Sequence, residues 1–165
     1  METADVVTQI LNRFQSAAQG QERFGRSESK VHRIGAGKLV ELARALKSEA
    51  GFDWLENLSA SDGEKEIVFT YFLRSSATHA TLILRSSAPV SKGSGIAGEP
   101  WVTMESLVSV WPMVGPKEKE IAPLFGVRFS GGSDPEIRWE GFPLRKSYDV
   151  IGAAGGAAVP GGVLP

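Results

Sequence analysis

The sequence predicts an α+β fold, in which helices cover a mostly antiparallel sheet and an extended arm follows at the C-terminus. Segments with the apolar spacing of amphipathic helices alternate with segments that have the apolar patterns of strands. The two strongest strand segments, residues 66–74 and 80–86, are joined by a short polar link, which is typical of an antiparallel hairpin. The expected order of elements is α, β, α, β, β, β, α.

Two helices open the predicted fold. The first covers residues 4–18, where five apolar residues share one face: Val6, Val7, Ile10, Leu11 and Phe14. A polar linker is expected over residues 19–30 and a short strand over residues 32–34. The second helix begins at Lys38, after a Gly-Ala-Gly turn, and ends at Gly51, because glycine readily adopts the left-handed conformation that closes helices.

Three strands and a last helix complete the prediction. The strands cover residues 52–60, 66–74 and 80–86. The middle strand, EIVFTYFLR, is apolar on both faces, which predicts cover on both sides of the sheet. After a Ser/Gly/Pro-rich loop at residues 87–100, Pro116 opens a short helix that Pro123 is expected to end.

The composition excludes several kinds of site and partner. Without cysteine the chain has no disulfide, thiolate nucleophile or ordinary iron–sulfur ligation, and its two histidines, His32 and His79, lack metal-ligand spacing. A net charge of −1 does not indicate nucleic-acid binding. No apolar run approaches the roughly 20 residues of a membrane span, and the acidic N-terminus does not resemble a secretory signal. We therefore expect the chain in the cytoplasm.

No motif indicates catalysis or cofactor binding, and we expect no catalytic, cofactor or metal residue. In residues 91–95 (SKGSG) the lysine precedes the glycines, unlike the order in a phosphate-binding loop, and residues 35–38 (GAGK) are more typical of a plain turn. Glu118 and Glu120 are two apart on a short helix, so they lie on different faces and make a poor acid/base pair. They suit the helix dipole or an ion pair with a partner protein.

Residues 136–148, EIRWEGFPLRKSY, point to a protein interface. Tryptophan, tyrosine and arginine dominate the binding energy of protein interfaces. Arg145 and Lys146 alone are too few to bind nucleic acid in a net acidic chain. Pro143, which has no backbone N–H, suits an extended segment lying against a partner. The tail after Gly152 has too few residues able to form a core, so we expect it to order on a partner or to stay mobile.

Two motifs resemble the 30-kilodalton subunit family of respiratory complex I. The first, PMVGPKEKEIAPLFGV at residues 112–127, is similar to the family signature at Pro112, Glu118, Glu120, Phe125 and Gly126, with Lys119 in place of arginine and Val127 in place of isoleucine. The second resembles the family's closing Trp-x-Gly-x-Pro-Leu-Arg-Lys-Asp-Tyr at Trp139, Gly141, Pro143, Leu144, Arg145, Lys146 and Tyr148. The resemblance divides the chain into an N-terminal helix and linker (1–30), a family-like α+β domain (31–150) and a Gly/Ala/Pro-rich tail (151–165).

Departures from the family pattern favour one branch of it. Pro116 and Pro123 replace the family's tryptophan and aspartate, Gly132 stands where histidine is common, and the stretch before Trp139 is shortened to residues 133–138. Related short subunits occur in membrane-bound energy-converting NiFe hydrogenases. The resemblance favours that branch over an NADH:quinone oxidoreductase, which stays open as an alternative together with a stand-alone α+β binding or hydrolytic domain.

The resemblance implies a non-catalytic assembly subunit without a cofactor of its own, in a complex that couples H2 evolution to ion translocation. Its partners would be the large subunit, which holds the NiFe site, and iron–sulfur subunits, which keep it peripheral on the cytoplasmic side of the inner membrane. Membrane contact would be indirect, and nucleic acid is not expected as a partner. The residues expected at the partner interface are Glu118, Lys119, Glu120, Phe125, Trp139, Phe142, Pro143, Leu144, Arg145, Lys146 and Tyr148.

Overall fold

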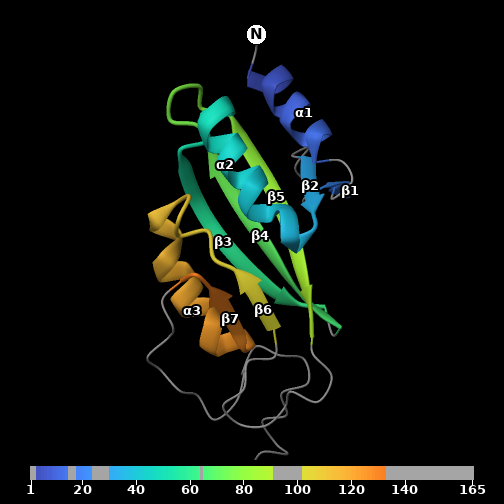
Figure 1. The fold of residues 1–165 in the computed structure, drawn as a ribbon, viewed down its shortest axis with the longest axis vertical. Coiled ribbons are helices and arrows are strands. Elements are labelled where there is room, and N and C mark those ends of the chain that lie inside the picture. The colour runs from blue at the N-terminus through green and yellow to red at the C-terminus, as the bar shows by residue number, and fades with distance from the viewer. Residues whose placement is uncertain (1–2, 15–17, 24–29, 64, 91–101, 133–165) are drawn as a thin grey trace, which may run out of the picture.

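The computed structural model describes residues 3–14, 18–23, 30–63, 65–90 and 102–132, and every structural statement concerns these residues. They form three α-helices, two 3-10 turns and seven strands (Figure 1). The elements are α1 (Thr3–Arg13), β1 (Ala18–Arg23), β2 (Lys30–Ile34), η1 (Ala36–Lys38), α2 (Leu39–Ala50), β3 (Trp54–Asp62), β4 (Glu66–Arg74), β5 (Thr81–Pro89), β6 (Val102–Glu105), η2 (Pro112–Val114), α3 (Gly115–Phe125) and β7 (Val127–Ser130).

The α+β prediction is confirmed, with a mixed main sheet. Its strand order is β1-β2-β5-β4-β3, and β2 pairs with β5 in parallel while the other three pairings are antiparallel. The predicted β4–β5 hairpin is present, and Asp53 holds its turn by accepting hydrogen bonds from the backbone N–H and the hydroxyl of Ser76. A second sheet pairs β6 with β7 in parallel.

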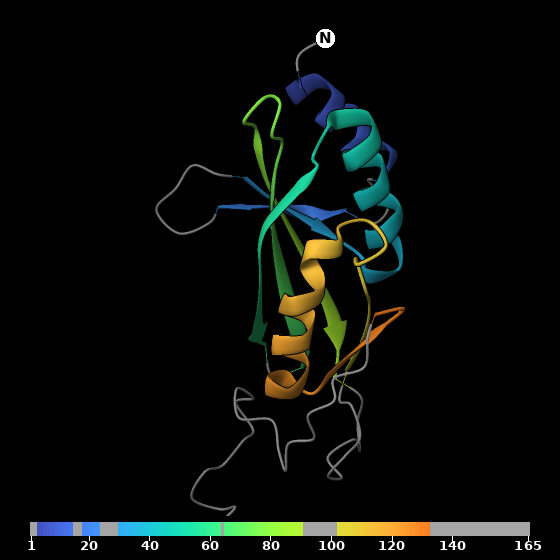
Figure 2. The same cartoon turned by 90° about the vertical axis from the view of Figure 1, so that its left-hand side faces the viewer.

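The helices cover one face of the main sheet. In Figures 1 and 2, α1 and α2 lie against that face, and α3 lies beside the edge formed by β3. The inward-facing residues of β4 are almost completely buried: Ile67, Phe69, Tyr71 and Leu73. On the outward face of β4, Val68 and Phe72 are half-buried and Thr70 is buried. Cover on both faces was predicted; among the described residues the helices pack on one side or at the edge, so the partial burial of the outward face does not come from these helices.

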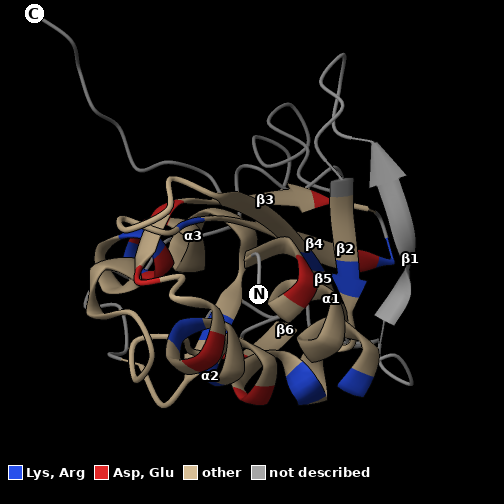
Figure 3. Cartoon of the chain, turned by 90° about the horizontal axis from the view of Figure 1, so that it is seen from above, with Lys and Arg blue, Asp and Glu red and all other residues tan. Residues whose placement is uncertain are grey.

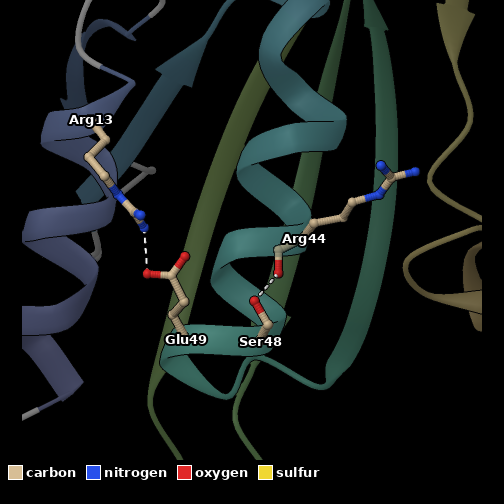
Figure 4. Close-up of polar contacts among 4 residues, drawn as sticks. All are labelled: Arg13, Arg44, Ser48 and Glu49. Carbon is tan, nitrogen blue, oxygen red and sulfur yellow. Dashed lines mark hydrogen bonds and ion pairs between the residues drawn. The ribbon is translucent and has the colours of Figure 1, made fainter.

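α2 follows the prediction closely. Its apolar face is fully buried and consists of Leu39, Leu42, Ala43, Leu46 and Ala50. Gly51 closes it in the left-handed conformation, with φ of 70°. The charged residues of α1 and α2 lie on the outer surfaces of these helices (Figure 3). Arg13 of α1 reaches Glu49 of α2 at 2.6 Å, and on α2 the Ser48 hydroxyl donates to the Arg44 carbonyl (Figure 4). Both partners of the ion pair are about half exposed, so it contributes little stability.

Two helix ends were predicted wrongly, and three strands were not predicted. The first helix ends at Arg13 and not at residue 18, and residues 18–23, expected in a polar linker, form β1. Pro123 does not end the last helix, which continues to Phe125. The strands β6 and β7 were not predicted. The predicted tail and the segment from residue 133 lie outside the described residues.

Candidate partner interface

α3 carries the candidate interface residues that the structure describes. Pro116 lies in the first turn of α3. Backbone N–H groups there have no partner within the helix, so the missing N–H of proline costs no helical hydrogen bond. Gly126, left-handed with φ of 68°, closes the helix. The buried face consists of residues spaced three and four apart: Glu118, Ile121, Ala122 and Phe125. α3 is therefore amphipathic, but one member of its buried stripe is a carboxylic acid.

The carboxylate of Glu118 accepts two hydrogen bonds inside the fold, from the loop that follows β6. Glu118 is 3% exposed, and its Oε2 accepts a 2.7 Å hydrogen bond from the hydroxyl of Ser106 while its Oε1 accepts a 3.0 Å bond from the backbone N–H of Leu107. Burial raises the pKa of Glu118 above its ordinary value, and the two hydrogen bonds act in the opposite direction. Glu118 stands in the first turn of α3, as the helix-dipole alternative expects, but its carboxylate pairs with two donors of the loop after β6 and not with a partner protein.

Lys119 and Glu120 lie on the exposed side of α3. Glu120 forms a 3.2 Å ion pair with Lys117, and both side chains are about half exposed. The predicted separation of Glu118 and Glu120 onto different faces is confirmed. Phe125 is only 7% exposed and belongs to the core. Of the four interface candidates on α3, two are therefore available at the surface and two support the helix from inside.

Three hydrogen bonds fix the segment before α3 against the first half of the fold. They join Lys47 Nζ to the Val110 carbonyl (2.6 Å), Trp111 Nε1 to the Phe52 carbonyl (2.9 Å) and the Leu55 N–H to Met113 Sδ (3.3 Å). Trp111 is completely buried. The orientation of α3 relative to the main sheet thus depends on one side chain of α2, Lys47, and on the backbone groups of Phe52 and Leu55.

The remaining interface candidates lie outside the described residues: Trp139, Phe142, Pro143, Leu144, Arg145, Lys146 and Tyr148. The described chain reaches Gly132, which packs against Ser106 and Glu118. Sequence reasoning missed the roles of Ser106 and Trp111. The sequence gives a sign of burial only for Trp111, which is a large aromatic residue in the apolar stretch before Pro112. Nothing near Ser106 in the sequence indicates that its hydroxyl donates to a carboxylate of another element.

The candidate sites for small ligands are weak where the structure describes them. His32 is half-buried in β2, His79 is exposed in the β4–β5 turn, and no group of three or more His, Cys, Asp or Glu among the described residues could hold a metal ion. A cavity of about 10 Å³ beside Arg33, Arg85 and Ser86 has room for about one water molecule. Across the same described ranges, no helix is long and apolar enough to cross a membrane.

Comparison with known proteins identifies a family that covers most of the chain. The family described as "Respiratory-chain NADH dehydrogenase, 30 Kd subunit" matches residues 32–154. An NADH-quinone oxidoreductase subunit of Trichlorobacter lovleyi is 30% identical over 123 residues, which are 69% of this chain and 70% of that protein. An NAD(P)H-quinone oxidoreductase subunit of a Synechococcus species is 30% identical over 115 residues, which are 65% and 62% of the two chains.

The fold also resembles a solved structure. A chain of the membrane-bound sulfane sulfur reductase, described as an archaeal respiratory membrane complex, superposes with a TM-score of 0.68 at 23% identity. The match covers 91% of this chain and 87% of the other. At this level of identity the likeness concerns the fold alone.

Proposed function

The chain belongs to the family of the 30 Kd subunit of respiratory-chain NADH dehydrogenase, and from this membership we propose that it is an assembly subunit of a complex I-like respiratory complex. It braces the peripheral arm and carries out no chemistry of its own. The observation that carries the proposal is the family match over residues 32–154, which includes both motifs singled out in the sequence. Cofactors reside in the neighbouring subunits.

The finer proposal is a place in a membrane-bound energy-converting NiFe hydrogenase. Its partners are then a large subunit that holds the NiFe site and iron–sulfur subunits, and together they evolve H2 coupled to ion translocation. The departures from the family pattern at Pro116, Pro123 and Gly132 support this branch. An NADH:quinone oxidoreductase is the second candidate, supported by the names of the relatives in Trichlorobacter and Synechococcus.

The interface has an exposed part on α3 and a part in residues 139–148, here named the closing segment. Lys119 and Glu120 contribute opposite charges from the surface of α3, where partner groups can reach them. The closing segment adds aromatic and basic side chains of the kinds that anchor interfaces. Glu118 and Phe125 act from inside, by fixing the helix. The domain from residue 31 to 150 is held on the cytoplasmic side of the membrane through these partners.

Co-purification tests the proposal. The full-length chain is tagged and isolated from its host, and the associated subunits are identified by mass spectrometry. A large subunit with two Cys-x-x-Cys pairs, together with H2-dependent dye reduction, identifies a hydrogenase, whereas a flavin-containing NADH module identifies the second candidate. Recovery of the chain without any oxidoreductase subunit would refute assembly and revive the stand-alone domain.

A double substitution tests the closing segment. Arg145→Ala with Lys146→Ala should reduce the recovery of partner subunits while the isolated chain keeps its unfolding midpoint, as expected of a pair that contacts the partner and not the core of this domain. Arg44→Ala with Lys65→Ala, at two exposed positions, on α2 and directly before β4, is the matched control. Loss of folding in the first variant would show that the pair stabilises this chain internally.

A further inference from the structure

We propose that Pro123 leaves the backbone carbonyl of Lys119 open at the surface of α3, where it accepts a hydrogen bond from a neutral N–H group of a partner subunit. That group belongs to a side-chain amide or to the backbone of the partner. This inference rests on the proposed function, and it names the chemistry that the partner brings to the exposed side of α3. It also gives a role to a residue that a helix does not favour.

Pro123 lies inside α3, where proline is the least favourable of all residues. The helix continues past it to Phe125, and the N–H of Gly126 bonds to the Ala122 carbonyl. Proline has no N–H to donate to the carbonyl four residues before it, and its ring crowds that carbonyl. One position of the helical hydrogen-bond ladder is therefore left open within a helix that is otherwise continuous.

The carbonyl that loses its donor is that of Lys119, and it lies at the surface. Lys119 is exposed and Pro123 is half-buried, and the carbonyl points along the helix from the first toward the second. Among the described residues, no hydrogen bond from outside α3 reaches this oxygen. Figure 1 shows α3 at the margin of the described fold. A backbone oxygen in this position bonds to water until another molecule supplies a donor.

The described fold gains little from the proline at position 123. The buried face of α3 consists of Glu118, Ile121, Ala122 and Phe125, so Pro123 is not part of it. The proline is not needed to stop the helix either, because Gly126 closes it in the left-handed conformation. Departures from local preference that bring no gain in packing are expected at functional sites. The open carbonyl is the one chemical group that this departure creates.

The charges around the open carbonyl favour a neutral donor. The exposed charged residues of α3 are Lys117, Lys119 and Glu120, and Lys117 forms a 3.2 Å ion pair with Glu120. Two positive charges against one negative charge make this surface positive, which disfavours an arginine or lysine of a partner. An amide N–H is a hydrogen-bond donor without charge, so it meets the carbonyl without this repulsion.

Two proline substitutions on the same helix test the inference. Pro123→Ala supplies the missing N–H, which closes the Lys119 carbonyl into the helix. Pro116→Ala is the matched control, because Pro116 lies in the first turn, where its missing N–H costs no helical hydrogen bond. Each full-length variant is produced beside the unaltered chain in the host, and mass spectrometry measures the ratio of the two chains in the purified complex. Thermal unfolding of each isolated full-length chain measures its stability.

We expect the unaltered chain to exceed Pro123→Ala in the complex about tenfold or more, because the partner's buried N–H loses its acceptor. The unfolding midpoint of isolated Pro123→Ala should rise by about 3 °C or more, since the helix gains a hydrogen bond and loses the proline. Pro116→Ala should enter the complex equally with the unaltered chain and keep its midpoint. An equal loss of binding in both variants would overturn the inference.

Two further results would also overturn it. Pro123→Ala may enter the complex as well as the unaltered chain does, which would show that no partner group binds the carbonyl. A loss of binding without a higher midpoint would show that the partner contacts the proline ring and not the carbonyl. Recovery of the unaltered chain without any oxidoreductase subunit is a different result, because it refutes the proposed function and the inference falls with it.

Discussion

The indole Nε1 of Trp111 donates a 2.9 Å hydrogen bond to the backbone carbonyl of Phe52. Both residues are buried, Trp111 completely and Phe52 with only 1% exposed. Phe52 follows the end of α2, and Trp111 precedes η2 and α3. This bond therefore connects the layer of α2 and the main sheet to the α3 unit, and it is one of the three hydrogen bonds that hold the segment before α3 in place.

Trp111→Phe should lower the free energy of unfolding by about 2–3 kcal/mol, because it leaves a cavity and an unsatisfied buried carbonyl. Urea unfolding of the full chain measures the loss. Trp54→Phe, at a tryptophan that is 53% exposed, is the matched control and should change stability by less than about 0.5 kcal/mol. Equal effects at both positions would contradict the role given to the Phe52 bond.

Tyr71→Phe should leave stability unchanged or raise it by up to about 1 kcal/mol. Tyr71 is fully buried, and its hydroxyl oxygen has no hydrogen-bond partner among the residues that the structure describes. Burial, and to a smaller extent the nearby charge of Glu118, raises the pKa of Tyr71, so the phenol stays neutral. Thermal unfolding of Tyr71→Phe and of the unaltered protein measures the difference in stability. A loss above about 1 kcal/mol would mean that the hydroxyl makes a stabilising hydrogen bond.

Glu118→Gln should change how stability depends on pH. Burial raises the folded-state pKa of Glu118, so the folded protein holds this proton more tightly than the unfolded chain does. The stability that protonated Glu118 contributes is fully present below the pKa of this group in the unfolded chain. It is lost as pH rises through the pKa of Glu118 in the folded protein. Urea unfolding between about pH 4 and about pH 8 should show the native protein losing stability relative to Glu118→Gln as pH rises. A constant difference between the two curves would contradict the raised pKa.

Gly51→Ala should lower the free energy of unfolding by about 1 kcal/mol, because Gly51 has φ of 70° and a Cβ atom is strained in that conformation. Gly37→Ala provides a comparison, since Gly37 has open space around it and no positive φ. Circular dichroism during thermal unfolding measures the stability of both variants. If Gly37→Ala costs as much as Gly51→Ala, the loss arises from something other than the left-handed cap.

The parts of the fold that could be predicted from sequence have long local patterns. α2 repeats its apolar residues over three turns before a glycine. β4 is rich in β-branched and aromatic residues, and a short polar link joins it to the apolar start of β5. Local patterning of this kind decides structure before any distant contact forms. β1, by contrast, reads AQGQER, which carries no strand pattern, and its strand state depends on pairing with β2.

The strands β6 and β7 could not be predicted because each has four residues and its partner lies across α3. The length of α3 was underestimated for a related reason. Pro123 cannot donate to the Lys119 carbonyl, but the helix continues for only two residues beyond it, so a single helical bond is lost. The burial of Glu118 was missed because its donors, Ser106 and Leu107, belong to a different element.

The parallel pairing of β2 with β5 has a consequence for the order in which the chain folds during its synthesis. β2 pairs with β1 on one side, but its other side pairs with residues 83–85, which leave the ribosome much later, after β3 and β4. Until then α2 exposes its row of leucines without the sheet that covers them. The β1–β2 hairpin and α2 must therefore wait for β5, and the nascent chain is most prone to aggregation in this interval.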